Sequence, residues 1–143
     1  MIYESFSPEE TRKIAFDIAE NAKESAVFCL TGDLGAGKTV FAKGFAEGLG
    51  INEHITSPTF TIFNIYNGRI PLYHFDMYRI EDEDELYNLG VEEYFYGKGI
   101  CLIEWPEMAM RLIPDHAAWI SIKKDINKSE DYRKIQINFS KPN

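Results

Sequence analysis

The sequence predicts one mixed α/β domain spanning residues 1–143, and three observations support this fold class. A chain of 143 residues, 45% of them hydrophobic, has the size and composition of a single compact domain. Short apolar runs typical of buried strands alternate with stretches whose apolar residues recur at helical spacing. A glycine-rich segment joins the first apolar run to the helix that follows, as at the start of many α/β domains.

The first third of the chain shows the pattern of a helix, a strand and a second helix. Ser7 is a suitable N-cap, a proline follows at the first helical position, and Glu10 completes a capping box. Apolar residues then keep helical spacing as far as Ala22, which predicts the first helix. The apolar run 26–30 predicts a strand, and the pattern over 38–49, closed by a glycine, predicts the second helix.

A β-hairpin is predicted in the middle of the chain. Residues 59–66 alternate between polar and apolar side chains, and Asn67-Gly68 is typical of a type I′ turn. Residues 69–75 are therefore expected to pair back on the first strand. The remaining expected elements are helical segments at 81–89 and 91–96 and strands at 100–103, 117–124 and 132–139.

The charge balance and the missing export signals narrow the classes of function. Lys and Arg number 15 and Asp and Glu 23, a net charge of −8, whereas unaided nucleic-acid binding needs a basic face. No apolar run approaches the roughly 20 residues that span a bilayer, and residues 1–5 do not resemble a signal peptide. Cys29 and Cys101 each lie in an apolar run, which favours buried thiols over a disulfide. We therefore expect a cytoplasmic protein without membrane contact.

The glycine-rich segment Gly32–Thr39, with the sequence Gly-Asp-Leu-Gly-Ala-Gly-Lys-Thr, matches the phosphate-loop pattern G-x-x-x-x-G-K-[ST]. Its glycines allow successive backbone N–H groups to face an anion, and the following helix adds the positive end of its dipole. Lys38 can reach the β- and γ-phosphates of a nucleotide, and the Thr39 hydroxyl can ligate Mg²⁺. The alternative is a glycine-rich turn that only packs a helix on a sheet. The segment does not fit the dinucleotide pattern G-x-G-x-x-G.

Three further places carry candidate catalytic or metal-binding groups. Glu104 closes an apolar strand, the position of a metal-binding acid in phosphate-loop enzymes, although a solvated strand-end acid is the alternative. Asp76 is suited to orient or deprotonate an attacking water. The segment 56–59 is rich in hydroxyls that are suited to complete a metal shell as a nucleotide-sensing switch, or it is simply a turn before a strand. The sequence assigns no role to His74, Arg79 or Trp105.

Taken together and in order, these segments resemble the TsaE (YjeE) family, the small bacterial ATPase required for threonylcarbamoyladenosine in tRNA. The phosphate loop alone is shared by many families, whereas its combination with the other segments is specific. The resemblance covers about residues 7–133. Its motifs are Ser7-x-x-x-Thr11, Gly32–Thr39, Thr56-Ser57-Pro58-Thr59-Phe60, His74-Phe75-Asp76-Met77-Tyr78-Arg79 and Leu102-Ile103-Glu104-Trp105-Pro106-Glu107.

The resemblance implies a fold and a set of site residues. The fold is a P-loop NTPase with a mixed, largely parallel sheet flanked by helices. Lys38 and Asp76 would serve catalysis, and Thr39 and Glu104 would hold Mg²⁺. The switch residues would be Thr56, Ser57 and Thr59. The nucleotide would contact Thr11, Asp33, Leu34, Gly35, Ala36, Gly37, Lys38, Thr39 and Arg133.

The resemblance also implies an activity and partners. The family hydrolyses ATP slowly and supports the TsaB–TsaD heterodimer, which forms the threonylcarbamoyl group on adenosine 37 of tRNAs that read ANN codons. This subunit would meet tRNA only through that complex. The residues alone leave ATP or GTP open, because the GTPase pattern N-K-x-D is missing and no other base-reading motif is evident.

Two other functions remain open from the residues themselves. A small-molecule kinase would use the same phosphate loop, but such enzymes usually carry an arginine-rich lid, and this chain has no arginine-rich segment. A nucleotide-gated binding module would bind ATP without needing its hydrolysis. A phosphorylated metabolite would indicate the kinase. A variant that binds but does not hydrolyse ATP would separate the module from the ATPase.

Overall fold

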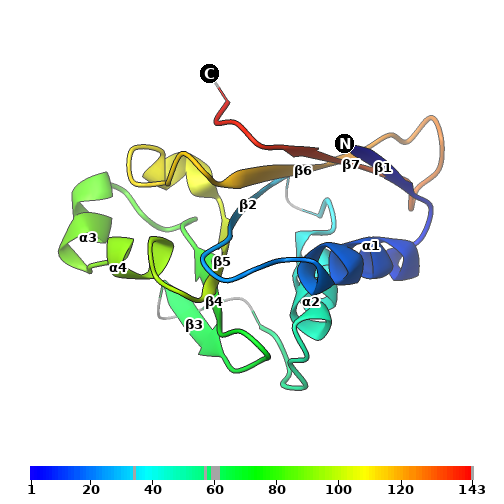
Figure 1. Cartoon of the computed structure of the whole chain (residues 1–143). Coiled ribbons are helices and arrows are strands. Elements are labelled where there is room, and N and C mark those ends of the chain that lie inside the picture. The colour runs from blue at the N-terminus through cyan, green and yellow to red at the C-terminus, as the bar shows by residue number, and fades with distance from the viewer. Residues whose placement is uncertain (34, 57, 59–61, 143) are drawn as a thin grey trace.

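A seven-stranded sheet forms the centre of the molecule, with helices on both of its faces (Figure 1). The computed structural model describes residues 1–33, 35–56, 58 and 62–142. The strands are β1 (Ile2–Ser5), β2 (Val27–Thr31), β3 (Phe63–Tyr66), β4 (Leu72–Asp76), β5 (Ile100–Glu104), β6 (Ala118–Lys124) and β7 (Arg133–Asn138). Their order across the sheet is β1-β7-β6-β2-β5-β4-β3. Strands β6, β2, β5 and β4 run parallel, and the outer pairings are antiparallel, which confirms the predicted mixed sheet.

The helices divide between the two faces of the sheet. They are α1 (Pro8–Glu20), α2 (Lys38–Gly48), α3 (Glu83–Asn88), α4 (Glu92–Phe95) and a short 3-10 helix, η1 (Pro106–Ala109). Helices α1 and α2 cover one face, and α3 and α4 lie on the other (Figure 1). Every helix in the described part of the chain is too short or too polar to cross a membrane.

Strands β2 and β5, in the middle of the sheet, are buried on both sides, which explains why their sequences are largely apolar. Successive residues point to opposite faces, so that Leu30 and Leu102 join the core under α1 and α2. Their neighbours Cys29 and Ile103 join the core under α3 and α4. The thiols of Cys29 and Cys101 are both buried and unpaired, as predicted.

The first helix starts as predicted, through hydrogen bonds of its first turn. The Ser7 hydroxyl accepts a hydrogen bond from the backbone N–H of Glu10 at 3.1 Å. The Glu10 carboxylate in turn accepts one from the N–H of Phe6, a residue earlier than a standard capping box, at 3.0 Å. Helix α2 likewise begins at the predicted Lys38.

The predicted β-hairpin is confirmed, but its predicted type I′ turn is wrong. Tyr66 pairs with Leu72, so residues 67–71 form the connection. A type I′ turn needs positive φ at both central residues, and neither Asn67 nor Gly68 has it. Gly68 instead allows a close approach to the end of α2, because a Cβ there would lie 2.4 Å from a backbone oxygen. Residues 59–61 of the expected strand lie outside the described residues.

Strand β1 has no counterpart among the predicted elements. Its residues pair with β7 in antiparallel fashion, with Ile2 opposite Gln136 and Ser5 opposite Arg133. The strand is short, and its partner comes from the other end of the chain. A local pattern of four residues therefore contained no signal for it.

Candidate functional site

The phosphate loop connects the carboxyl end of β2 to the start of α2. Gly37 is the N-cap of α2 and has a φ of +107°, a conformation that L side chains rarely adopt. Gly37 has no side chain with which to cap the helix, so it leaves the amide groups of the first turn without a side-chain cap. The positive end of the dipole of α2 lies at the same N-terminus. This is the backbone arrangement in which helix N-termini bind phosphate.

A cavity of about 290 Å³ lies in front of the loop and collects most of the predicted reactive groups. They come together because adjacent parallel strands β4 and β5 both end at this edge of the sheet, next to the start of α2. The lining residues are Gly35, Gly37, Lys38, Thr39, Val40, Asp76, Glu104 and Trp105.

Lys38 is a buried cation to which the described residues offer no hydrogen-bond acceptor. The residue is only 7% exposed, and its Nζ has no hydrogen-bond partner among the described residues. The ammonium instead lies 3.7 Å from the centroid of the Trp105 ring. Burial lowers the pKa of Lys38, and the charges of Glu104, Glu107 and Asp76 oppose that shift. A buried ammonium that makes no hydrogen bond is costly, and an anion in this cavity would remove the cost.

Trp105 covers the lysine from a backbone conformation that is rare for a bulky residue. Its φ is +55°, in the left-handed region, and Pro106 follows as the first residue of η1. The ring also contacts Tyr78, with the two ring centroids 5.0 Å apart. Trp105 therefore lies between an exposed aromatic residue and the Lys38 ammonium. Its position immediately after Glu104 was the only sequence signal for this role.

Asp76 and Glu104 lie opposite each other at the ends of β4 and β5, yet their surroundings differ. Glu104 is buried, and its Oε2 lies 2.5 Å from Nε2 of His74. Asp76 is half-buried, and its carboxylate accepts a hydrogen bond from the backbone N–H of Tyr78 at 3.0 Å. Burial raises the pKa of Asp76 above its ordinary value. Glu104 thus pairs with a histidine side chain, whereas Asp76 accepts a backbone hydrogen bond and has a raised pKa.

The oxygen donors in the cavity fit a magnesium ion that is shared with a bound phosphate. Thr39 supplies a hydroxyl and Glu104 a carboxylate, both of them hard oxygen ligands. Among the described residues, no group of three or more His, Cys, Asp and Glu side chains is suited to hold a metal by itself. Mg²⁺ usually keeps few protein ligands and takes others from substrate phosphates, which matches this sparse set.

A second, larger cavity of about 650 Å³ adjoins the first and shares Trp105 with it. The predicted nucleotide-binding residues Asp33 and Ala36 line it, together with Lys123 and Lys124. The two lysines were missed in the sequence, where their position at the carboxyl end of a parallel strand was the available signal.

Arg133 holds the phosphate loop from the neighbouring strand β7. Its Nε donates to the backbone oxygen of Ala36 at 2.6 Å, and its Nη1 donates to the backbone oxygens of Glu130 and Tyr132. The predicted residue Arg133 thus contacts the phosphate loop, by a hydrogen bond to the loop backbone.

Other predicted residues lie away from the cavities or outside the described chain. Thr11 is buried in α1, where its hydroxyl lies 2.7 Å from that of Ser5, and it lines neither cavity. Thr56 is exposed, and its backbone oxygen accepts a hydrogen bond from the Tyr66 hydroxyl at 3.4 Å. Leu34, Ser57 and Thr59 lie outside the described residues.

Comparison with known proteins finds likeness along most of the chain. Residues 5–135 match the sequence model of the family described as threonylcarbamoyl adenosine biosynthesis protein TsaE. A Bacillus subtilis protein named tRNA threonylcarbamoyladenosine biosynthesis protein TsaE is 50% identical over 134 residues, covering 93% of this chain and 82% of that protein. The protein of the same name from Treponema pallidum is 42% identical over 119 residues, covering 83% and 88% of the two chains. The crystal structure of Bacillus subtilis YdiB matches with a TM-score of 0.81 at 43% identity, over 99% of this chain and 86% of that one.

Proposed function

The chain belongs to the TsaE family of threonylcarbamoyladenosine biosynthesis proteins, and from this premise we propose that it is a magnesium-dependent ATPase. We propose that it binds ATP at the phosphate loop and hydrolyses it slowly. The observation that carries the proposal is the buried Lys38 ammonium, which has no acceptor among the described residues and lines the same cavity as the first residues of α2. A triphosphate would supply the missing acceptor and use the helix N-terminus at the same time.

The residues of the cavity support hydrolysis of the terminal phosphate. Asp76 would orient the attacking water and take its proton, a role that suits a carboxylate whose pKa burial has raised. The new bond joins the water oxygen to the γ-phosphorus, and the bond to the β–γ bridging oxygen breaks, which yields ADP and phosphate. Lys38 would balance the charge on the phosphates. Thr39 and Glu104 would hold Mg²⁺, which when bound neutralises charge on the β- and γ-phosphates.

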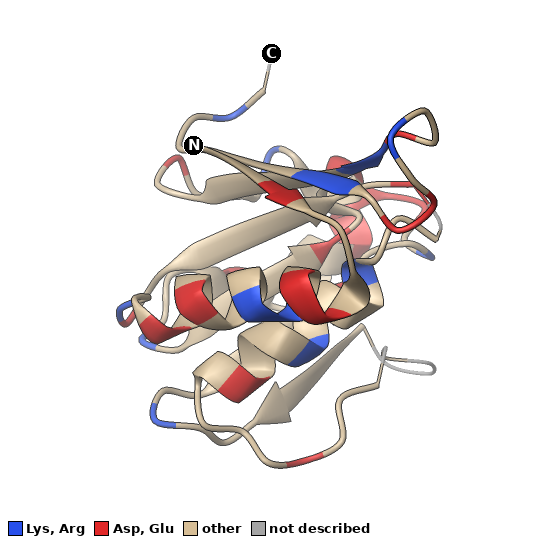
Figure 2. Cartoon of the chain, turned by 90° about the vertical axis from the view of Figure 1, so that its right-hand side faces the viewer, with Lys and Arg blue, Asp and Glu red and all other residues tan. Residues whose placement is uncertain are grey.

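The choice of ATP and of partners comes from family membership. We propose that this subunit supports the TsaB–TsaD heterodimer in forming the threonylcarbamoyl group on tRNA. The net charge of −8 favours a protein partner over direct contact with tRNA. Acidic and basic residues are interspersed along α1 rather than segregated (Figure 2), which also gives that helix no basic face.

The direct test is nucleotide binding by calorimetry, with and without Mg²⁺, followed by hydrolysis with and without the TsaB–TsaD pair. We expect ATP binding in the wild type and none in Lys38→Ala. Equal ATP affinity in the two proteins would contradict the proposal. A phosphorylated small molecule among the products would indicate a kinase instead. Unimpaired tRNA modification with a variant that binds but does not hydrolyse ATP would indicate a nucleotide-gated binding module.

A further inference from the structure

His74 and Glu104 form a buried polar pair at the edge of the phosphate cavity. Their side chains are only 2% and 6% exposed, and the distance from Nε2 to Oε2 is 2.5 Å. A carboxylate oxygen can only accept, so we assign the proton of this hydrogen bond to Nε2 of the histidine. The other ring nitrogen, Nδ1, has no hydrogen-bond partner within the described residues. The bond to Glu104 is therefore the polar contact that orients the ring.

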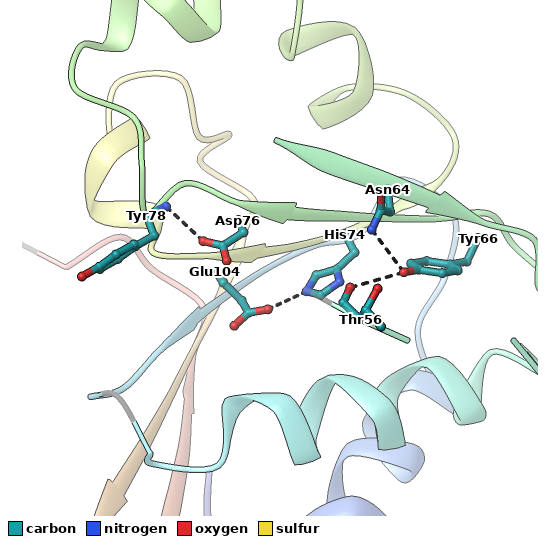
Figure 3. A network of polar contacts seen from close by, with 7 residues as sticks. All are labelled: Thr56, Asn64, Tyr66, His74, Asp76, Tyr78 and Glu104. Atoms are coloured by element: carbon teal, nitrogen blue, oxygen red, sulfur yellow. Dashed lines mark hydrogen bonds and ion pairs between the residues drawn. The ribbon is translucent and has the colours of Figure 1, made fainter. Parts of the chain in front are cut away.

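The strand register explains how this bond orients Glu104. His74 lies opposite Leu102 in the β4–β5 ladder, and Asp76 lies opposite Glu104. The Glu104 side chain thus reaches back along the sheet to meet the histidine. Figure 3 shows one carboxylate oxygen directed at His74 and the other pointing away from it. Within the described residues, the second oxygen accepts no hydrogen bond, and Glu104 lines the cavity together with Thr39.

The β-hairpin places His74 beside Asn64. Asn64 of β3 lies directly opposite His74, so the two side chains share one face of the sheet. The Asn64 amide donates to the Tyr66 hydroxyl at 3.3 Å, and that hydroxyl donates to the backbone oxygen of Thr56 (Figure 3). His74 is therefore part of the hairpin, and the hairpin residue Tyr66 contacts the start of the hydroxyl-rich segment 56–59.

We propose, on the basis of the ATP and magnesium binding proposed above, that His74 is the positioning residue of the metal site. Its Nε2–H fixes one oxygen of Glu104 and leaves the other to face the cavity as a magnesium ligand beside Thr39. Groups that orient a metal ligand through a hydrogen bond typically contribute about 10–100-fold to metal affinity. The role concerns metal binding and leaves the contact between nucleotide and phosphate loop unchanged.

Two amide substitutions separate this role from simple packing. In His74→Gln the amide nitrogen can reach the place of Nε2 and donate to Glu104, whereas in His74→Asn it is one methylene too short. Mn²⁺ replaces Mg²⁺ as the probe, and its binding to the protein–ADP complex is followed by electron paramagnetic resonance. We expect His74→Asn to weaken Mn²⁺ binding by about 10–100-fold and His74→Gln to retain most of it. ADP affinity measured in EDTA should be equal in all three proteins.

The result that would overturn the inference is wild-type Mn²⁺ affinity in His74→Asn, or equal losses in both variants. Thermal unfolding of each variant checks that the fold is intact. If the wild type itself bound ADP but no Mn²⁺, the proposed magnesium site would fail, and the role of His74 with it. If the wild type bound Mn²⁺ and only the histidine variants behaved unexpectedly, the proposed ATPase would stand without this positioning residue.

Discussion

Lys13, Lys38 and Lys128 each lie close to an aromatic ring, and a comparison of Lys128 with Lys38 shows that only the first is given an anion by the described part of the fold. Lys128 follows β6, lies 4.6 Å from the centroid of the Tyr132 ring, and makes an ion pair with Glu4 at 3.0 Å. Lys38 lies 3.7 Å from the centroid of the Trp105 ring and has no hydrogen-bond partner among the described residues. Lys128 is about half-exposed and Lys38 is buried. The described residues therefore give an anion to Lys128, which water could have solvated, and no hydrogen-bond acceptor to the buried Lys38.

The acids near these two lysines, Glu4 beside Lys128 and Asp76 beside Lys38, also differ in the direction of their pKa shifts. The Tyr132 hydroxyl and the Lys128 ammonium lower the pKa of Glu4, which favours its charged form. Burial raises the pKa of Asp76 and favours its neutral form. The edge formed by β1 and β7 carries residues of both signs side by side (Figure 2). Charges that match each other indicate structure, whereas charges left unmatched in a cavity indicate a site for a ligand.

The largest effect is expected from replacing Lys38, which has no hydrogen-bond partner among the described residues. Lys38→Met should weaken ATP binding by about 100-fold or more, since each charge-assisted hydrogen bond contributes about 1.5–3 kcal/mol. The free energy of unfolding should stay equal or rise by up to ~1 kcal/mol, because a buried unpaired charge is removed. Calorimetry and urea denaturation measure the two quantities. Lys128→Met is the matched control, and a lower stability of Lys38→Met would show that the ammonium is satisfied without ligand.

Replacing the acid with the raised pKa should separate binding from turnover. Asp76→Asn is expected to lower the rate of ATP hydrolysis by about 10²–10⁴-fold, the usual contribution of a general base. ATP affinity should change little, because binding depends on the phosphate loop. Asp82→Asn is the control and should hydrolyse at the wild-type rate, because the Asp82 carboxylate also accepts a hydrogen bond from the N–H two residues on but lines neither cavity. Phosphate release assays give the rate, and equal rates in Asp76→Asn and wild type would remove Asp76 from the mechanism.

The aromatic cover of Lys38 should produce a smaller effect of opposite sign. We expect a phosphate ligand of Lys38 to displace the indole of Trp105, whose cation–π contact is worth about 0.5–2 kcal/mol. Trp105→Leu is therefore expected to raise the affinity for tripolyphosphate, which has no base to stack, by about 2–30-fold. Tryptophan emission should respond to tripolyphosphate in the wild type and in Trp119→Phe but not in Trp105→Phe. Unchanged affinity in Trp105→Leu would show that the ring does not compete with the ligand.

The smallest effect is expected at the satisfied lysine. Lys128→Met should lower Tm by about 2 °C or less at pH 7 and leave ATP binding unchanged, because exposed ion pairs contribute little. The pKa of Glu4 is lowered in the fold, so its contribution is present above the ordinary carboxyl range and is lost as the pH falls through the lowered value. The difference in Tm between variant and wild type should therefore vanish in acid, where Glu4 is protonated in the folded and the unfolded state. A difference that persists there would assign the effect to packing of the lysine stem.

Much of the site was predictable because its chemistry is written in contiguous residues. The phosphate loop is one segment in which spacing alone sets the cap, the lysine and the hydroxyl at the start of α2. Glu104 and Asp76 were predictable as acids at strand ends, since parallel strands end at the same edge of a sheet. The central strands followed from continuous apolar runs, and the first helix followed from apolar periodicity and the Ser7 cap.

The tertiary structure alone decided the contacts between distant segments. The hydrogen bond from His74 to Glu104 spans 30 residues, and that from Arg133 to Ala36 spans 97. The pairing of β1 with β7 likewise joins the two ends of the chain. Local propensity acts over a few residues, whereas these contacts depend on strand order and register, which are set by how the whole core packs. The sequence by itself therefore determined which groups the site contains. The packed sheet determined which of them form hydrogen bonds with one another and which have no partner among the described residues.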